Sequence, residues 1–474
     1  MKAAGLDREG NLGQNPCEEA PVIRTPIDQQ APSLGRTAAV MLLCIVVSTC
    51  GDSSSTGPTH PPPGRWLGAQ TIDAGPPPGT SGTNATAPRV GMDAAGGAVA
   101  DFLSAEAIWA TRAARGQAWG SPSLLGELPP GAASNALWEP SLAVNRGGVA
   151  LVTWATQEPS VAGRQVFSRR LDPLTGWTAA ERIDAGEARE LVLPYAASLA
   201  LDDRANGLAV WDSGGVVAVR LSATSGWQVP ERIAERPSSV PRVFLDGAGR
   251  GFATWSLSGE AFARRFETDR GWTETTRFVP DAGWSFTGSG EVAFDTSGQA
   301  LLVWQRNQGS TQTSSTWSAF YAGGRWSTLG AISASGGRAV NPRIGIDANG
   351  RGITVWSEQL AGPTYARYER GAWGTPQLIL SAPGGGPTAL AVSAGGDAMV
   401  AWQETDTATG RGRVWAARYT GGAWGARESL QASSNEPNAP AVSIDPCGNA
   451  VAIWSEFESG RTRVWANRYE TACP

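Results

Sequence analysis

A short block of alternating apolar and polar residues recurs eight times along the chain from residue 88 onward. Each block has Asp or a substitute, then Gly three residues later in seven copies, and an aromatic residue nine residues after the Asp. Alternation with period two predicts a β-strand on each side, and Asp-x-x-Gly predicts the turn between them. We therefore expect eight β-hairpins. The Asp-type positions are Asp93, Asn145, Asp202, Asp246, Asp295, Asp347, Ser393 and Asp445, and the aromatic ends are Phe102, Trp154, Trp211, Trp255, Trp304, Trp356, Trp402 and Trp454.

A third strand and a fourth strand that begins with Trp follow most hairpins. Four strands in each repeat of about 50 residues is typical of a β-propeller blade. The last hairpin has no such fourth strand, but the segment RWLGAQTIDAG at 65–75 matches the fourth strand GWTAAERIDAG at 176–186. We expect this N-terminal strand to complete the last blade and close the ring, because an open sheet edge would otherwise remain. The sequence predicts an all-β fold with one closed propeller of about eight four-stranded blades, with seven as the alternative.

The N-terminal region is typical of a bacterial export signal. After Arg36, the apolar stretch 37–49 is too short to span a bilayer but suits the hydrophobic part of a signal peptide. The run before Cys50 resembles a lipobox, which predicts lipidation of Cys50 and an anchor in the cell envelope, with the outer membrane favoured; an uncleaved anchor is the alternative. We expect residues 1–50 to be the signal peptide, 51–64 a Ser- and Pro-rich tether, and 65–474 the propeller.

Composition removes several classes of function. The net charge of −5 has no basic run, so a nucleic-acid partner is not expected. The single histidine, His60, lies in a Pro-rich stretch, so we expect neither histidine catalysis nor a metal site with several histidine ligands. We expect no metal, no cofactor and a monomer.

Two cysteines follow the signal region within the expected propeller. Cys447 lies in the turn between the first two strands of the last blade, and Cys473 follows its third strand. Both positions fall on the same side of the blade, so a disulfide is expected to fasten the C-terminus, with two free thiols as the alternative.

Residues that recur in every blade are interpreted as structural. The repeated Asp side chains should cap turns, because no repeat has the D-x-D-x-D run of a calcium loop. The repeated Trp residues should pack between blades. The same holds for the arginines that recur in the third strands, which should pack between blades or pair with acids of the fourth strands. These are Arg112, Arg170, Arg220, Arg265, Arg367, Arg418 and Arg468.

Residues that break the repeat are the better candidates for binding. Aromatic side chains precede first strands in three blades, and a Glu follows the core Trp by two residues in three others. We expect these residues on one face of the ring, where aromatic faces and carboxylates suit sugar binding; ordering of the loops is the alternative. The candidates are Trp138, Tyr195, Trp284, Glu358, Glu404 and Glu456.

From residue 65 onward, the repeat resembles the Trp-rich β-propeller repeats of uncharacterised secreted bacterial lipoproteins. It is loosely similar to the Asp-box repeats of sialidase-like propellers, but the Asp box has Gly and Trp closer to the Asp. The repeat-regular arginines also differ from the three arginines that sialidases bring together from dissimilar places. The resemblance implies a fold and leaves function open. We expect a non-catalytic envelope module that binds a glycan or a surface protein; the alternatives are a glycoside-processing hydrolase or lyase with rim carboxylates and a structural envelope protein.

Overall fold

A computed structural model gives the fold of the chain. It describes residues 64–73, 84–104, 106–129, 140–157, 164–184, 197–235, 239–309, 311, 313–334, 336–359, 361–381, 385–405, 409, 411–431, 437 and 440–472. These residues form strands and turns, with no helix among them. They contain no helix long and apolar enough to cross a membrane.

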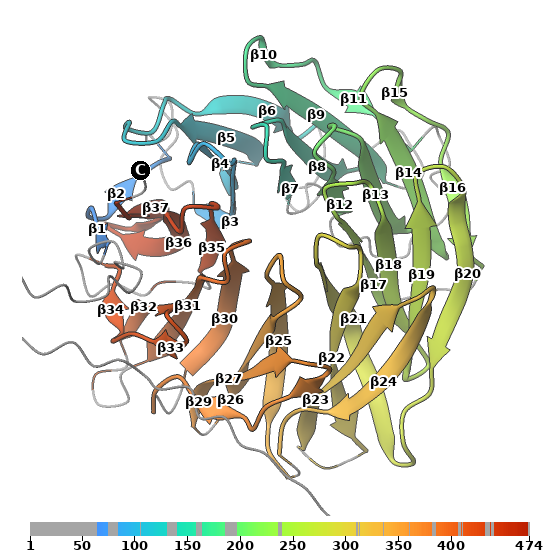
Figure 1. Ribbon diagram of the computed structural model, residues 1–474. Helices are drawn as coiled ribbons and strands as arrows, with labels where there is room; N and C mark the ends of the chain where they lie inside the picture. The colour runs from blue at the N-terminus through green and yellow to red at the C-terminus, as the bar shows by residue number, and fades with distance from the viewer. Residues whose placement is uncertain are drawn as a thin grey trace, which may run out of the picture. The chain divides into compact units, whose positions relative to one another are not determined.

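Eight antiparallel sheets surround a central axis as the blades of a β-propeller (Figure 1). The expectation of eight blades is confirmed, and the seven-bladed alternative is wrong. From the inner to the outer strand, blades 1 to 4 are β3 (Ala85–Met92), β4 (Ala98–Ser104), β5 (Ala107–Ala113) and β6 (Ser123–Glu127); β7 (Ser141–Val144), β8 (Ala150–Thr156), β9 (Gln165–Asp172) and β10 (Gly176–Trp177) with β11 (Glu181–Arg182); β12 (Ser198–Leu201), β13 (Gly207–Asp212), β14 (Val216–Ser222) and β15 (Gly226–Trp227) with β16 (Glu231–Ala234); and β17 (Ser239–Leu245), β18 (Gly251–Leu257), β19 (Glu260–Glu267) and β20 (Gly271–Phe278). Blades 5 to 8 are β21 (Trp284–Phe294), β22 (Ala300–Gln308), β23 (Ser314–Ala322) and β24 (Arg325–Ala331); β25 (Ala339–Ile346), β26 (Gly352–Glu358), β27 (Gly362–Glu369) and β28 (Ala372–Trp373) with β29 (Gln377–Leu378); β30 (Gly385–Val392), β31 (Ala398–Thr405), β32 (Gly412–Thr420) and β33 (Ala423–Trp424) with β34 (Glu428–Ser429); and β35 (Ala441–Ile444), β36 (Ala450–Glu458), β37 (Arg461–Glu470) and β1 (Arg65–Trp66) with β2 (Gln70–Thr71).

The two ends of the chain meet in blade 8, as the sequence predicts. The N-terminal strands β1 and β2 pair antiparallel with β37, so blue and red ribbons lie side by side in Figure 1. Trp66 contacts Tyr469 edge to face, with ring centroids 5.4 Å apart. Arg463 Nη2 contacts Asp73 Oδ1 at 2.7 Å, and the Asp73 side chain is only 5% exposed. This closure satisfies backbone groups that would otherwise form an open edge.

The turn between the first two strands is held by the Asp of the repeated block. In blade 4, Asp246 Oδ1 accepts hydrogen bonds from the backbone N–H groups of Ala248 at 3.0 Å and Arg250 at 2.8 Å. Gly249 adopts a φ of +85°, which glycine tolerates best. Ala205, the substitute in blade 3, adopts a φ of +62° in its place. The recurring Asp is therefore a turn-capping residue.

The aromatic ends of the blocks form the cores between blades. All eight of these side chains are 0–5% exposed. Trp154 packs toward Ile108 and Leu125 of the preceding blade. The recurring third-strand arginines also cross the seams: Arg468 donates to the Gly96 carbonyl at 2.7 Å, and Arg220 lies over Phe266 and pairs with Glu231. Both groups have the structural roles that their regular spacing predicts.

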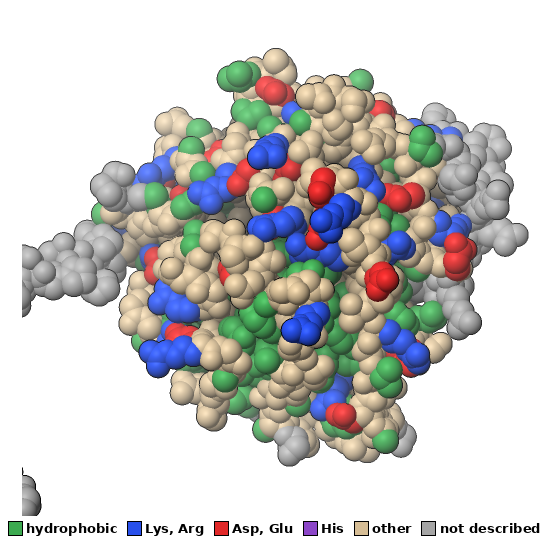
Figure 2. Space-filling view, turned by 45° about the vertical axis from the view of Figure 1, so that its right-hand side comes forward, with side chains coloured by type: hydrophobic (Ala, Val, Ile, Leu, Met, Phe, Trp, Pro, Cys, Tyr) green, Lys and Arg blue, Asp and Glu red, His purple; other side chains and the backbone are tan. Residues whose placement is uncertain are grey.

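Antiparallel order gives the ring two distinct ends. We call the end with the Asp turns and the third-to-fourth-strand turns the turn face, and the end with the second-to-third-strand hairpins and blade connections the loop face. The face seen in Figure 2 carries positive and negative side chains interspersed, with hydrophobic side chains gathered toward its centre. This mixture agrees with the low net charge of the chain.

Candidate functional site

The predicted rim residues that the structure describes lie on the loop face. Trp284 begins the inner strand β21, and Glu358 lies at the end of the second strand β26. One face of the Trp284 ring is covered by the Arg306 guanidinium, 4.4 Å from the ring centroid, and Arg306 Nη1 contacts Asp281 Oδ2 at 2.6 Å. Trp138 and Tyr195 lie outside the described residues. The structure therefore places four of the six predicted binding residues.

The three predicted carboxylates are each engaged by protein groups. Glu456 is 1% exposed and accepts hydrogen bonds from Trp454 Nε1 and Gln431 Nε2, both at 2.9 Å. Glu358 accepts from the Arg338 backbone N–H at 2.6 Å and from Trp356 Nε1 at 3.4 Å.

Glu404 instead pairs with Arg427 Nη1 at 2.5 Å. Two of the three carboxylates therefore hold the indole of the preceding core Trp, a structural contact that the two-residue spacing explains. Ligand binding by these residues stays a prediction.

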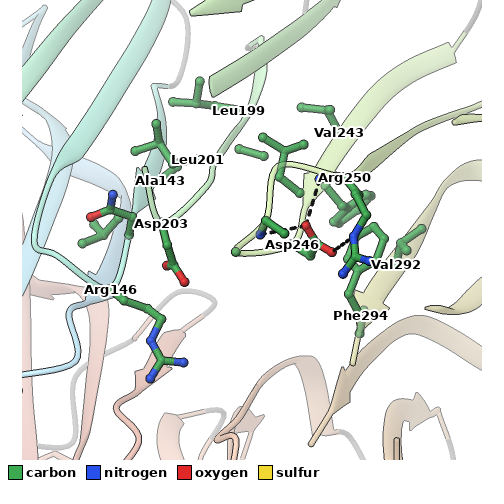
Figure 3. Close-up of a pocket in the computed structure, with 18 of the residues that line it drawn as sticks. Ala143, Arg146, Leu199, Leu201, Asp203, Val243, Asp246, Arg250, Val292 and Phe294 are labelled. Atoms are coloured by element: carbon green, nitrogen blue, oxygen red, sulfur yellow. Dashed lines mark hydrogen bonds and ion pairs between the residues drawn. The ribbon is translucent and has the colours of Figure 1, made fainter. Parts of the chain in front are cut away.

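A cavity with a volume of about 810 Å³ lies along the axis of the propeller. Inner strands β7, β12, β17 and β21 form much of its wall, and its lining extends into the turns of the turn face (Figure 3). The wall is apolar along Leu199, Val243 and Phe294, whereas charged groups, among them Arg146 and Asp203, lie near the turns (Figure 3). An apolar wall with a few placed charged groups is typical of a site for a small ligand.

A cluster of charged side chains lies on the inner strands, and its members Arg89 and Arg242 line the cavity. Arg242 of blade 4 and Arg343 of blade 6 both donate through Nη1 to Oε1 of Glu291, which blade 5 places between them. Arg89 of blade 1 lines the same cavity as Arg242. Arg242 and Arg343 share one carboxylate, so these three groups carry a formal charge of +1, from +2 and −1.

The surroundings make this positive charge costly. Burial lowers the pKa of Arg242 to about 9, and the neighbouring charges of Arg343 and Arg89 act in the same direction. Burial also lowers the pKa of Arg343. Both side chains still keep 37% of their surface exposed. An anion that entered the cavity would relieve the repulsion among these groups.

A buried carboxyl group adjoins the cluster. Asp101 of β4 is the register partner of Arg89 on β3 and is fully buried, at 0% exposure. Burial raises its pKa to about 7 from the ordinary 3.8, against the opposing effects of the Arg89 charge and of the backbone N–H groups of Arg89 and Asp101. A strongly perturbed acid beside a cavity is a mark of a functional site.

Sequence reasoning missed this cluster, although a signal for it was present. Its members each lie four residues before the Asp-type position of their block, on an inner strand. Across the eight blades this position reads Arg89, Ser141, Ser198, Arg242, Glu291, Arg343, Ala389 and Ala441. The other four blades have Ser or Ala at this position, so the charged residues break the repeat. They were not singled out because attention went to the arginines that recur regularly in the third strands. Within the described residues, no group of three or more His, Cys, Asp or Glu is placed to hold a metal ion.

Comparison with known proteins finds matches among solved structures only. No protein-family model and no curated protein matches this sequence. Solved structures that resemble the chain include the polysaccharide lyase Uly1, at 12% identity and a TM-score of 0.46 over 70% of this chain and 90% of that one. A leech intramolecular trans-sialidase matches at 8% identity and a TM-score of 0.38 over 79% and 82% of the two chains. The Aleuria aurantia lectin, in complex with Fucα1-6GlcNAc, matches at 12% identity and a TM-score of 0.35 over 63% and 96%.

A relation to Trp-rich lipoprotein repeats stays an expectation, since no family matches.

Proposed function

We propose that this protein is a non-catalytic glycan-binding module of the cell envelope that holds an acidic sugar in its central cavity. The observation that carries the proposal is that Arg242, which lines the cavity, shares the single carboxylate of Glu291 with Arg343, so that two guanidinium groups have one carboxylate between them. A carboxylate on the ligand would accept paired hydrogen bonds from guanidinium groups, which match its planar geometry.

The walls of the cavity suit the remainder of a sugar. Leu199, Val243 and Phe294 offer apolar surface for the C–H faces of the ring. Arg146 and Asp203 lie nearer the turn face, where hydroxyl groups would meet polar atoms. The volume of about 810 Å³ lies in the usual range of small-molecule sites and has room for more than one sugar ring.

Isothermal titration of the purified protein with glucuronate, and with glucose as the uncharged comparison, tests the proposal. We expect glucuronate to bind and Arg242→Ala to weaken it by about 10-fold or more, as for a lost charge-assisted hydrogen bond. Arg277→Ala is the matched control, since Arg277 pairs with Glu260 on the outside of blade 4. Equal binding of glucose and glucuronate, or equal losses in both variants, would refute the acidic-sugar site.

The same preparation tests the enzymatic alternative. Incubation with acidic oligosaccharides, followed by chromatography of the products, should recover the starting material unchanged. Release of shorter products would show that the protein is a hydrolase or lyase.

We also propose export of the protein as a monomer, with a lipid on Cys50 and an anchor in the outer membrane. Cys50 and Cys473 lie outside the described residues; Cys447 is disulfide-bonded. Labelling of cells with radioactive palmitate should mark the protein and not its Cys50→Ala variant. Mass spectrometry of unreduced peptides should find Cys447 joined to Cys473, and free thiols at both positions would contradict the proposed pairing.

A further inference from the structure

A second cavity, with a volume of about 290 Å³, lies on the loop face between blades 5 and 6. Blade 5 forms one wall through the end of β22 and the hairpin that follows it, with Gln305, Asn307 and Gly309. Blade 6 forms the other wall through Arg338, just before β25, and Gln359, just after β26. The cavity is therefore at the opposite end of the ring from the turns that line the central cavity.

The cavity arises because blade 5 projects further than blade 6 on this face. β22 continues four residues beyond its core Trp304, to Gln308, whereas β26 ends two residues beyond Trp356. The difference in length leaves a recess at the loop-face end of the seam, next to the core that Val303 and Trp356 form.

Hydrogen bonds across the seam hold the two walls together. The Ser314 backbone N–H donates to the Gly337 carbonyl at 3.1 Å. The Asn341 backbone N–H donates to Gln305 Oε1 at 3.0 Å. The walls are thus fixed before a ligand arrives, which lowers the cost of binding.

These contacts also fix the orientation of the amides in the lining. A backbone N–H can only donate, so Gln305 turns its oxygen to Asn341, and Gln305 Nε2 then donates to Asn307 Oδ1 at 3.1 Å. A guanidinium group can also only donate, so Arg338 Nη1 faces the oxygen of Gln359, at 3.3 Å. The three amide oxygens of the lining are therefore all engaged.

The groups that remain for a ligand are donors. Asn307 Nδ2 and Gln359 Nε2 make no hydrogen bond within the part of the chain that the structure describes. Arg338 is the one charged residue of the lining, which gives the lining a formal charge of +1. Donors beside a positive charge favour a ligand group that brings acceptor oxygens and a negative charge, and a carboxylate has both.

Glu358 does not neutralise this cavity through the guanidinium group. Its carboxylate accepts from the backbone N–H of Arg338 and from the Trp356 indole, and it is absent from the described lining. No described carboxylate forms an ion pair with the Arg338 side chain. The guanidinium group is therefore available to a ligand.

The amides of blade 5 depart from the repeat. Gln305 and Asn307 lie one and three residues after the core aromatic residue of their block. In the other blades, from blade 1 onward, these positions are Leu103 and Ala105, Ala155 and Gln157, Asp212 and Gly214, Ser256 and Ser258, Ser357 and Gln359, Gln403 and Thr405, and Ser455 and Phe457. Only blade 5 has an amide at both positions, so construction of the ring does not account for the pair.

We propose that this cavity is a second ligand site, which binds the carboxylate of a small acidic ligand through Arg338, Asn307 and Gln359. The proposal does not rest on the function proposed above, because the two cavities share no described lining residue and lie toward opposite ends of the ring.

Titration with sodium acetate, followed by NMR of the purified protein with isotopically labelled asparagine, tests the site. The side-chain NH₂ signal of Asn307, assigned by its loss in Asn307→Asp, reports on the cavity directly. We expect acetate to shift this signal until it saturates. Acetamide, the uncharged isostere, and sodium chloride at the same concentration should leave it in place. No shift with acetate, or an equal shift with acetamide, would overturn the proposal.

Arg338→Ala should weaken acetate binding by about 10-fold or more, as for a lost charge-assisted hydrogen bond. Arg325→Ala is the matched control, because Arg325 is an exposed arginine at the start of β24 and lies outside the lining. Equal acetate affinity in the two variants would refute the site.

Gln359→Glu is a second variant that spares the fold, because Gln359 is exposed. It keeps an oxygen toward Arg338 and adds a carboxylate that competes with the ligand, so acetate should again bind about 10-fold more weakly or less. Gln377→Glu makes the same change at an exposed amide on the outer edge of blade 6 and should have no effect. Unchanged acetate binding in Gln359→Glu would contradict the proposal.

Arg242→Ala separates this site from the central one. An Asn307 shift that persists in Arg242→Ala and is lost in Arg338→Ala supports the second site even where glucuronate does not bind in the central cavity. A shift that Arg242→Ala abolishes and Arg338→Ala leaves intact would assign the carboxylate to the central cavity and overturn the second site.

Discussion

The buried carboxyl of Asp101 should make the stability of the propeller depend on pH. In the unfolded chain its pKa lies near 3.8, and in the folded protein burial raises it to about 7. Asp101 therefore stabilises the fold in full below pH 4, and this contribution is lost as pH rises from about 4 through 7. The difference of about three pH units, at 1.36 kcal/mol for each, corresponds to about 4 kcal/mol.

The substitution Asp101→Asn keeps the shape of the side chain and removes its ionisation. A buried carboxamide has a cost of its own, but that cost does not change with pH. The informative quantity is therefore the difference in unfolding free energy between the two proteins as a function of pH. Between pH 5 and pH 7 the wild-type protein should lose about 2 kcal/mol relative to the variant.

Urea denaturation at pH 5, 6, 7 and 8, followed by tryptophan fluorescence, measures this difference. Asp269→Asn is the control, because the Asp269 side chain is 79% exposed and should give no such trend. A constant difference between wild type and Asp101→Asn from pH 5 to pH 8 would show that Asp101 titrates normally in the folded protein.

Three further outcomes follow from the structure. Arg463→Ala should destabilise the fold by about 3 kcal/mol in denaturant titration, since it leaves the buried carboxylate of Asp73 without its partner at the ring closure; an unchanged midpoint would contradict this. Glucuronate binding should weaken as salt is raised from 50 to 500 mM in the titration, because salt ions screen the attraction between the ligand carboxylate and the partly exposed arginines. Salt-independent binding would argue against a charge-based site. The double variant Trp138→Ala, Trp284→Ala should lose sugars in a glycan screen if the loop face also binds ligand, and unchanged binding would leave the central cavity as the sugar site.

The sequence alone predicted the fold in detail because propeller blades are local units. Alternation, Asp-x-x-Gly turns and a core Trp are repeated eight times, and each copy folds through contacts with its neighbours along the chain. The N-terminal match at 65–75 also predicted the closure. The last blade lacks a fourth strand of its own, and the segment at 65–75 has the sequence of one, so pairing the two completes the blade.

The candidate site was predicted less well, and the reason is physical. Glu358 and Glu456 were singled out by their position after a core Trp, but hydrogen bonding to that indole accounts for the same spacing. Their burial and partners become visible only when the blades are packed together. The sequence placed them on the loop face, and it gave no sign of a cavity that reaches the turn face.

Local spacing determined the strands, the turns, the number of repeats and the likeness of the two chain ends. Tertiary structure decided which side chains meet at the axis. Arg89, Arg242, Glu291 and Arg343 come from four blades and lie far apart in sequence, and only closure of the ring brings them to one level of the central channel. Their shared position, four residues before the Asp-type residue, indicates one level in each blade, but which of these side chains touch depends on the curvature of the whole ring.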